Sequence, residues 1–122
     1  MMLDDDGMDT TWYVVDSDNN VAEFASNGYG FYPDLDQDSL MDWCDSLKED
    51  RAVDSALSVP NGYWKTLAKK GLFAYDFDES GSYKMVASSS NPIKLAQKVD
   101  NIVRVNFKFT DKKIINIKDF KK

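Results

Sequence analysis

The amino-acid sequence predicts a single α+β domain with a mainly antiparallel sheet of about five to six strands and two helices packed on one side. Segments rich in β-branched and aromatic residues alternate with turn sequences, and two other segments carry apolar residues at helical spacing. The 122-residue chain is 43% hydrophobic and shows no repeat or linker. We therefore expect residues 11–122 to form one domain, preceded by a flexible N-terminus over residues 1–10.

The first predicted element is a β-hairpin. The segments "TWYVVDS" (11–17) and "VAEFAS" (21–26) are strand-like, and the "DNN" between them is a turn sequence. Alternation along the second strand places Ala22 and Phe24 in the core.

A helix is predicted within residues 34–50, because apolar side chains recur there at i, i+3, i+4 and i+7. These side chains are Leu40, Trp43, Cys44 and Leu47. Asp36 or Asp38 is expected to cap the N-terminus of this helix.

A second, shorter helix is predicted over residues 63–70. Tyr63, Trp64 and Leu67 are expected to face inward. Gly71 follows the helix and is typical of a helix end.

The remaining segments mostly predict strands. Residues 72–77 and 83–88 are strand-like around the turn "DESGS", residues 93–99 fit either a strand or a helical turn, and residues 114–120 read as a last strand. The segment 102–109 alternates cleanly and is expected to be a half-buried strand. Its two faces are Val103, Val105, Phe107 and Phe109 on one side, and Ile102, Arg104, Asn106 and Lys108 on the other.

The residue types argue against an enzyme. The chain has no histidine, which removes Ser–His and Cys–His nucleophiles and His-ligated zinc. The single cysteine, Cys44, lies on an apolar helix face between Asp42 and Asp45, where a thiol is expected to be an unreactive small hydrophobe. We expect no catalytic residue and no cofactor.

Compartment and membrane contact follow from similar features. The acidic start "MMLDDDGMD" is unlike a secretory signal, and no apolar run is long enough to cross a bilayer. One cysteine cannot form an internal disulfide. We expect a cytoplasmic protein without a membrane partner.

Three segments imitate the start of a calcium-binding loop, which needs Gly at its sixth position and an acid at its twelfth. They are "DSDNNV", "DLDQDS" and "DFDESG", which begin at Asp16, Asp34 and Asp76. The first lacks both features, the second lacks the Gly and the third lacks the acid. Hairpin turns and a helix cap explain them better, and we expect no metal site; a calcium-responsive module stays an alternative.

Charge is unevenly distributed along the chain, whose formal net charge is −6. Residues 1–60 hold 15 acidic and two basic side chains, whereas residues 61–122 hold 6 acidic and 13 basic ones. Either the first half meets a basic partner or the two halves neutralise each other within the fold. The basic second half interleaves Lys and Phe, but alternation puts the Phe side chains on the opposite face, so we expect no nucleic-acid partner.

One face of the first predicted helix is acidic. At about 100° per residue, its acids lie close together and almost opposite the apolar face. They are Asp38, Asp42, Asp45 and Glu49. Adjacent like charges destabilise a helix by roughly 0.2–0.5 kcal/mol each. This ridge either binds basic groups of a partner or serves solubility and the chain's own basic half.

The loop "FASNGYGFYPD" (24–34) is unusually aromatic. At least one of its aromatic side chains is expected to pack on the helix. Because tyrosine suits an interface, we interpret Tyr29 or Tyr32 as an exposed anchor for a partner.

The pattern of two segments resembles small bacterial immunity proteins of polymorphic and contact-dependent growth-inhibition toxin systems. The first is "WYVVDSDNNVAEFASNGYGFYP" (12–33) and the second is "GYWKTLAKKGLFAYDFDESGSYKMVASSSNPI" (62–93). The matching positions in the first are Trp12, Asp16, Ala22, Phe24, Ser26, Gly28, Gly30 and Pro33. Where the family has a small residue this chain has Phe31 or Tyr32, so the aromatic pair is expected to be specific to this partner.

The resemblance implies a cytoplasmic protein that binds one cognate toxin as a heterodimer and blocks it. Secreted toxin domains of such systems are often nucleases with basic clefts, which an acidic surface can occupy. An alternative is an acidic, nucleic-acid-mimicking inhibitor of a host DNA-binding enzyme.

Overall fold

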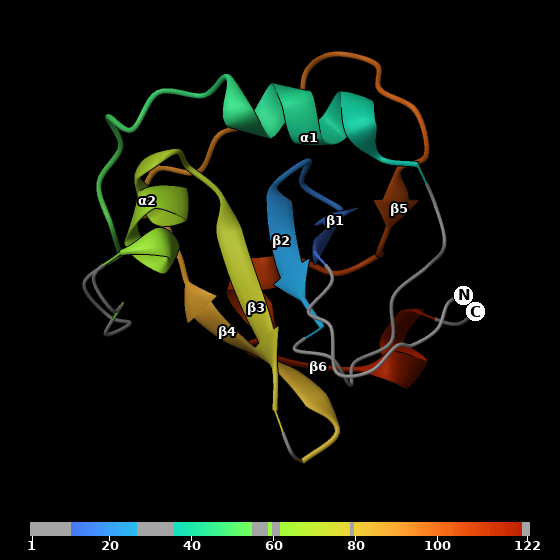
Figure 1. Ribbon diagram of the computed structural model, residues 1–122. Helices are drawn as coiled ribbons and strands as arrows, with labels where there is room; N and C mark the ends of the chain where they lie inside the picture. The colour runs from blue at the N-terminus through green and yellow to red at the C-terminus, as the bar shows by residue number, and fades with distance from the viewer. Residues whose placement is uncertain (1–10, 27–35, 55–58, 60–61, 79, 121–122) are drawn as a thin grey trace.

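The computed structural model describes residues 11–26, 36–54, 59, 62–78 and 80–120. It confirms the predicted α+β class, with two helices and a six-stranded sheet of order β5-β1-β2-β3-β4-β6 (Figure 1). The strands are β1 (Thr11–Val15), β2 (Val21–Ala25), β3 (Phe73–Phe77), β4 (Ser82–Ala87), β5 (Val103–Arg104) and β6 (Ile114–Asn116). The helices are α1 (Asp38–Asp45) and α2 (Tyr63–Lys69), with two 3₁₀ turns, η1 (Phe109–Asp111) and η2 (Ile117–Phe120).

The sheet is mixed. The pairs β1–β2 and β3–β4 are antiparallel hairpins, as expected, and β4–β6 is antiparallel as well. The pairs β1–β5 and β2–β3 are parallel. A long crossover through α1 and α2 separates β2 from β3 in the chain, as a parallel pair requires.

Both faces of the sheet are buried. Alternation along β1 sends Tyr13 toward the helices and Trp12 toward the opposite face. Leu40 of α1 and Leu67 of α2 join the same cluster as Tyr13, so both helices cover one face, as predicted. The C-terminal segment closes the other face, where Phe109 is fully buried.

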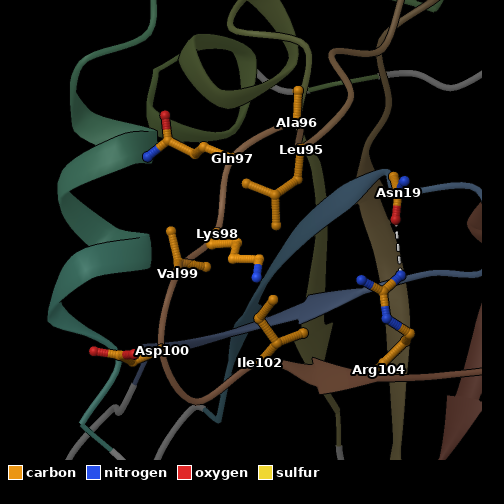
Figure 2. A pocket seen from close by; sticks show the side chains of 9 residues that line it. All are labelled: Asn19, Leu95, Ala96, Gln97, Lys98, Val99, Asp100, Ile102 and Arg104. Carbon is orange, nitrogen blue, oxygen red and sulfur yellow. Dashed lines mark hydrogen bonds between the residues drawn. The ribbon is translucent and has the colours of Figure 1, made fainter.

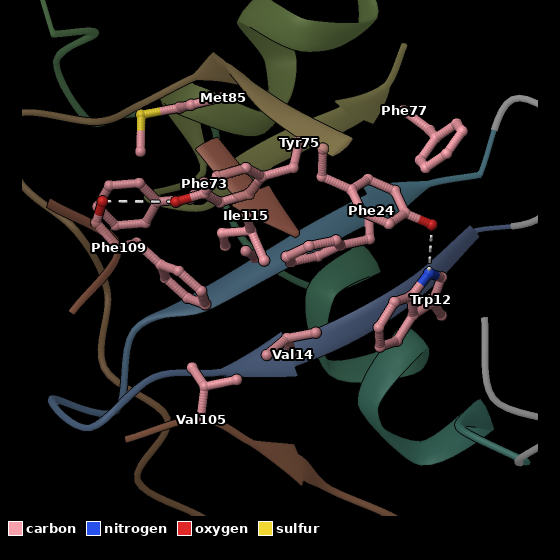
Figure 3. Packing of buried hydrophobic residues seen from close by; sticks show 12 residues of the cluster. Trp12, Val14, Phe24, Phe73, Tyr75, Phe77, Met85, Val105, Phe109 and Ile115 are labelled. Atoms are coloured by element: carbon pink, nitrogen blue, oxygen red, sulfur yellow. Dashed lines mark hydrogen bonds between the residues drawn. The ribbon is translucent and has the colours of Figure 1, made fainter. Parts of the chain in front are cut away.

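Aromatic rings fill the face opposite the helices (Figure 3). Phe24 is fully buried there, which confirms its assignment to the core, and its ring lies 4.8 Å from that of Tyr75 and 5.0 Å from that of Trp12. The Trp12 indole N–H donates to the hydroxyl of Tyr83 at 3.3 Å, so the buried polar tips are paired as well.

Asp16 organises the turn of the first hairpin. Its carboxylate is fully buried and accepts the backbone N–H groups of Asp18 and Asn20, each at 2.8 Å. It also accepts the Asn20 side-chain amide at 3.1 Å and the backbone N–H of Phe109 at 2.9 Å. This single side chain ties the hairpin to the C-terminal segment.

Three predicted elements are shorter than expected. The first helix ends at Asp45, because its last turn holds acids and no base at the negative end of the helix dipole. Of the strand predicted over 102–109, only β5 pairs with a neighbouring strand. The N–H of Phe109 donates to the Asp16 carboxylate instead of to a strand. The strand predicted over 114–120 stops at Asn116, whose N–H donates to the carboxylate of Asp119 at 2.8 Å.

The segment 93–99 is neither strand nor helix; a single bridge joins Lys94 to Asn20, and Leu95 is buried. The alternation in 102–109 nevertheless holds for burial except at Ile102, which is half-buried against the cluster under the helices. Val105 and Phe109 are buried, Val103 and Phe107 are half-buried, and Arg104, Asn106 and Lys108 are exposed.

Candidate partner-binding surface

The side chain of Gln37 fixes α1 to the sheet. Its amide oxygen accepts the backbone N–H of Tyr13 at 2.9 Å, and its amide nitrogen donates to the Tyr13 carbonyl at 3.0 Å. Gln37 therefore acts like one residue of a neighbouring strand beside β1. The expected capping by Asp36 or Asp38 is wrong, because the N-cap residue is Gln37 and it makes no side-chain cap hydrogen bond. The Asp36 carboxylate, one residue before the cap, accepts the N–H of Asp38 at 3.0 Å.

The two faces of α1 differ as predicted. Leu40 and Cys44 are buried against the sheet, and Trp43 is half-buried. Asp38, Asp42 and Asp45 are exposed along the other side of the helix, which crosses above β1 and β2 (Figure 1). We call these three aspartates the acidic face of α1.

No ion pair among the described residues involves the acidic face of α1. The ion pairs between described residues are Lys84–Asp78, Lys94–Asp18 and Lys112–Asp119. The two halves of the chain thus compensate each other at the first hairpin turn, where Lys94 lies 3.1 Å from Asp18. The charge of α1 is not compensated in this way.

Of the other predicted contact residues, the structure describes only Glu49. Glu49 is exposed but lies beyond the end of α1, so the expected four-residue ridge contains three aspartates only. Tyr29 and Tyr32 lie outside the described residues, and their role as anchors stays a prediction.

The expectation for α2 is correct at Leu67, which is buried, and at Trp64, which is half-buried against the core, but it is wrong at Tyr63. It was predicted to face inward, yet 59% of the residue is exposed. Its hydroxyl donates to the Glu23 carboxylate at 2.5 Å. The ring packs edge-on against Trp64, with centroids 5.5 Å apart.

Glu23 is the buried acceptor beneath this tyrosine. It lies in the middle of β2 with 2% of its surface exposed and also accepts the hydroxyl of Tyr13, its partner on β1, at 3.3 Å. Its partner on β3 is Ala74, whose small side chain leaves room on this face. Burial raises the pKa of the Glu23 carboxyl, and the hydrogen bonds from Tyr63 and Tyr13 oppose this rise.

Sequence reasoning missed both residues. The alternation that places Ala22 and Phe24 in the aromatic core puts Glu23 on the other face of β2, and the helix layer covers that face. A carboxylate inside the apolar run "VAEFA" was the available signal. The sequence contains no signal for the exposure of Tyr63, because the position of this side chain depends on Glu23, 40 residues away in the chain.

Cys44 is buried next to this group, as its helix face predicted. Burial raises the pKa of its thiol to about 12, with Glu23 and Asp45 adding to the rise. A thiol with this pKa carries almost no thiolate at neutral pH, so the surroundings disfavour nucleophilic chemistry.

A hollow of about 400 Å³ lies along the segment 95–104, which runs beside α1 (Figure 2). Lys98 and Arg104 point toward it, whereas Asp100 points away. Arg104 donates to the Asn19 side chain at 2.8 Å. The two cations of the hollow could attract a small anion, but the Arg104 guanidinium already donates to the carbonyl of the buried Asp16 at 3.2 Å as well as to Asn19.

Within the described residues, no group of three or more His, Cys, Asp or Glu side chains is arranged to hold a metal ion. In the first calcium-like segment, the Asp16 carboxylate is instead occupied by protein N–H groups.

Comparison of the chain with protein-family models, curated proteins and solved structures found no match. In the part of the chain that the structure describes, no helix has the length and apolar character needed to cross a membrane.

Proposed function

We propose that this chain is an immunity protein that binds a cognate bacterial toxin and neutralises it through the acidic face of α1. The observation that carries the proposal is the set of three exposed aspartates, Asp38, Asp42 and Asp45, which have no ion-pair partner among the described residues. The resemblance of residues 12–33 and 62–93 to immunity proteins supports the same interpretation.

A surface of this kind suits a basic cleft. Neighbouring carboxylates attract lysine and arginine side chains and speed the encounter with a basic partner by roughly 10- to 1,000-fold. If the partner is a nuclease, the aspartates occupy the positions where its basic residues would hold substrate phosphates. Such an inhibitor needs no catalytic group or cofactor of its own. It would work in the cytoplasm, as one half of a heterodimer with the toxin.

The proposal is tested by co-expression with the protein encoded by the reading frame immediately upstream of the gene for this chain. The wild-type chain should restore growth to cells that express this protein and should co-elute with it as a heterodimer. Asp42→Asn combined with Asp45→Asn should weaken both effects. Asp111→Asn is the matched control, because Asp111 is exposed in η1, next to Phe109 on the opposite face of the sheet.

Two results would contradict the proposal. One is an upstream protein that is harmless to cells or shows no binding to the wild-type chain. The other is equal protection by the Asp42/Asp45 variant and the Asp111 variant.

A further inference from the structure

The contact between Glu23 and Tyr63 is unusual for one that serves only the stability of the fold. A carboxylate that is 2% exposed is held by two tyrosine hydroxyls, and one of these tyrosines is 59% exposed. Burying a carboxylate is costly unless it is well paired, and an apolar residue of similar size often serves stability as well or better. The fold alone therefore gives little reason to keep Glu23.

We propose that Tyr63 is a preorganised contact for a lysine or arginine side chain of a basic protein partner, and that Glu23 is the positioning residue that holds it. This inference rests on the proposed function but adds a contact outside the acidic face of α1. It does not depend on the predicted anchors Tyr29 and Tyr32.

The hydrogen-bond direction makes Tyr63 suitable for a cation. Its O–H donates to the Glu23 carboxylate, so the phenol oxygen keeps lone pairs that can accept an N–H from a partner. The exposed ring can also lie against an ammonium or guanidinium group, which the negative face of an aromatic ring attracts.

Fixing the ring before binding adds to this effect. The hydroxyl is held by Glu23 and one edge of the ring by Trp64, so little side-chain freedom remains to be lost in the complex. Immobilising a rotamer-rich side chain on binding otherwise opposes association.

The groups around Glu23 come from every element that packs there. Tyr13 belongs to β1, Cys44 and Asp45 to α1, and Lys70 follows α2 directly. Tyr13 and Cys44 are neutral, so the charged groups are the carboxyls of Glu23 and Asp45 and the ammonium of Lys70. This local balance favours a cation at Tyr63 over an anion.

The role is tested with Tyr63→Ala, Tyr63→Phe and Glu23→Gln, by calorimetric titration with the upstream-encoded protein. Tyr63→Ala should weaken binding about 10- to 100-fold. Tyr63→Phe and Glu23→Gln should each weaken it about threefold to tenfold, and the double variant should be no weaker than either one, because Glu23 acts through the Tyr63 hydroxyl. Ile114→Ala, at a residue 51% exposed on the edge strand β6, should bind like wild type.

Urea unfolding separates this role from a purely structural one. Glu23→Gln should be at least as stable as wild type at neutral pH, since it removes a buried charge. If Tyr63→Ala fails to fold, the fold-preserving Tyr63→Phe still decides the question.

The outcomes distinguish the two proposals. Wild-type affinity of Tyr63→Phe and Glu23→Gln, together with weak binding of the Asp42/Asp45 variant, overturns the inference and leaves the proposed function standing. Additive losses in the double variant overturn the positioning role of Glu23. Failure of the wild-type chain to bind the upstream protein removes both proposals.

Discussion

Replacing Asp16 by alanine should destabilise the protein far more than any other change in the first hairpin turn. The carboxylate accepts four hydrogen bonds, and its donors include the backbone N–H groups of Asn20 and Phe109, two residues that are almost fully buried. An unpaired buried donor costs roughly 1–3 kcal/mol. Two such donors, together with the lost side-chain amide bond, give an expected loss of about 3–5 kcal/mol in the free energy of unfolding.

The measurement is equilibrium unfolding in urea, with Asp18→Ala as the control. Asp18 makes an exposed ion pair with Lys94, with about half of each side chain accessible, so its removal should change the free energy of unfolding far less than the removal of Asp16. Equal losses for the two variants would show that Asp16 does not hold the C-terminal segment in place. A rise in thermal stability with calcium, which disappears in Asp16→Ala, would instead favour the calcium-loop alternative.

Three further predictions concern other residues. Phe24→Ala should cost about 3–5 kcal/mol in urea unfolding, because Phe24 is fully buried among aromatic rings; a loss below about 1 kcal/mol would refute that packing. Cys44 should react with a thiol reagent at neutral pH only after unfolding, because the pKa of its buried thiol is about 12; rapid reaction in the native protein would contradict this. The Lys84 ammonium, with help from Ser80, lowers the pKa of the Asp78 carboxyl from 3.8 to about 2. The stability from this shift should be present above pH 3.8 and lost as the pH falls toward 2. Lys84→Met should move the pKa toward its usual value in an NMR titration, and an unchanged midpoint would exclude the ion pair as the cause.

Local periodicity was enough to predict much of the fold. The first hairpin, both helices and the hairpin of β3 and β4 follow from residue patterns within each segment. The parallel pairings and the short C-terminal strands do not, because they depend on distant groups such as the Asp16 carboxylate, 93 residues from Phe109. A hydrogen bond of that kind leaves no periodic signal in the sequence.

The same distinction between local patterns and distant contacts explains why the candidate surface was predicted only in part. The acidic face of α1 follows from helical spacing, apart from Glu49, which the early end of the helix removes from the ridge. Glu23 and Tyr63 come together only when β2 and α2 are packed. The pairing of Glu23 and Tyr63 is evident only in the tertiary structure. A carboxylate inside an apolar strand is the one unusual feature that the sequence itself shows.

The rate of association with the upstream-encoded protein tests the central proposal most directly. It should be measured at low and high ionic strength for the wild-type chain, for Asp42→Asn combined with Asp45→Asn, and for Asp111→Asn. The account predicts that the paired substitution slows association about tenfold or more at low salt and flattens the salt dependence, whereas Asp111→Asn behaves like wild type. Association of the paired variant at the wild-type rate, with the wild-type salt dependence, would contradict it.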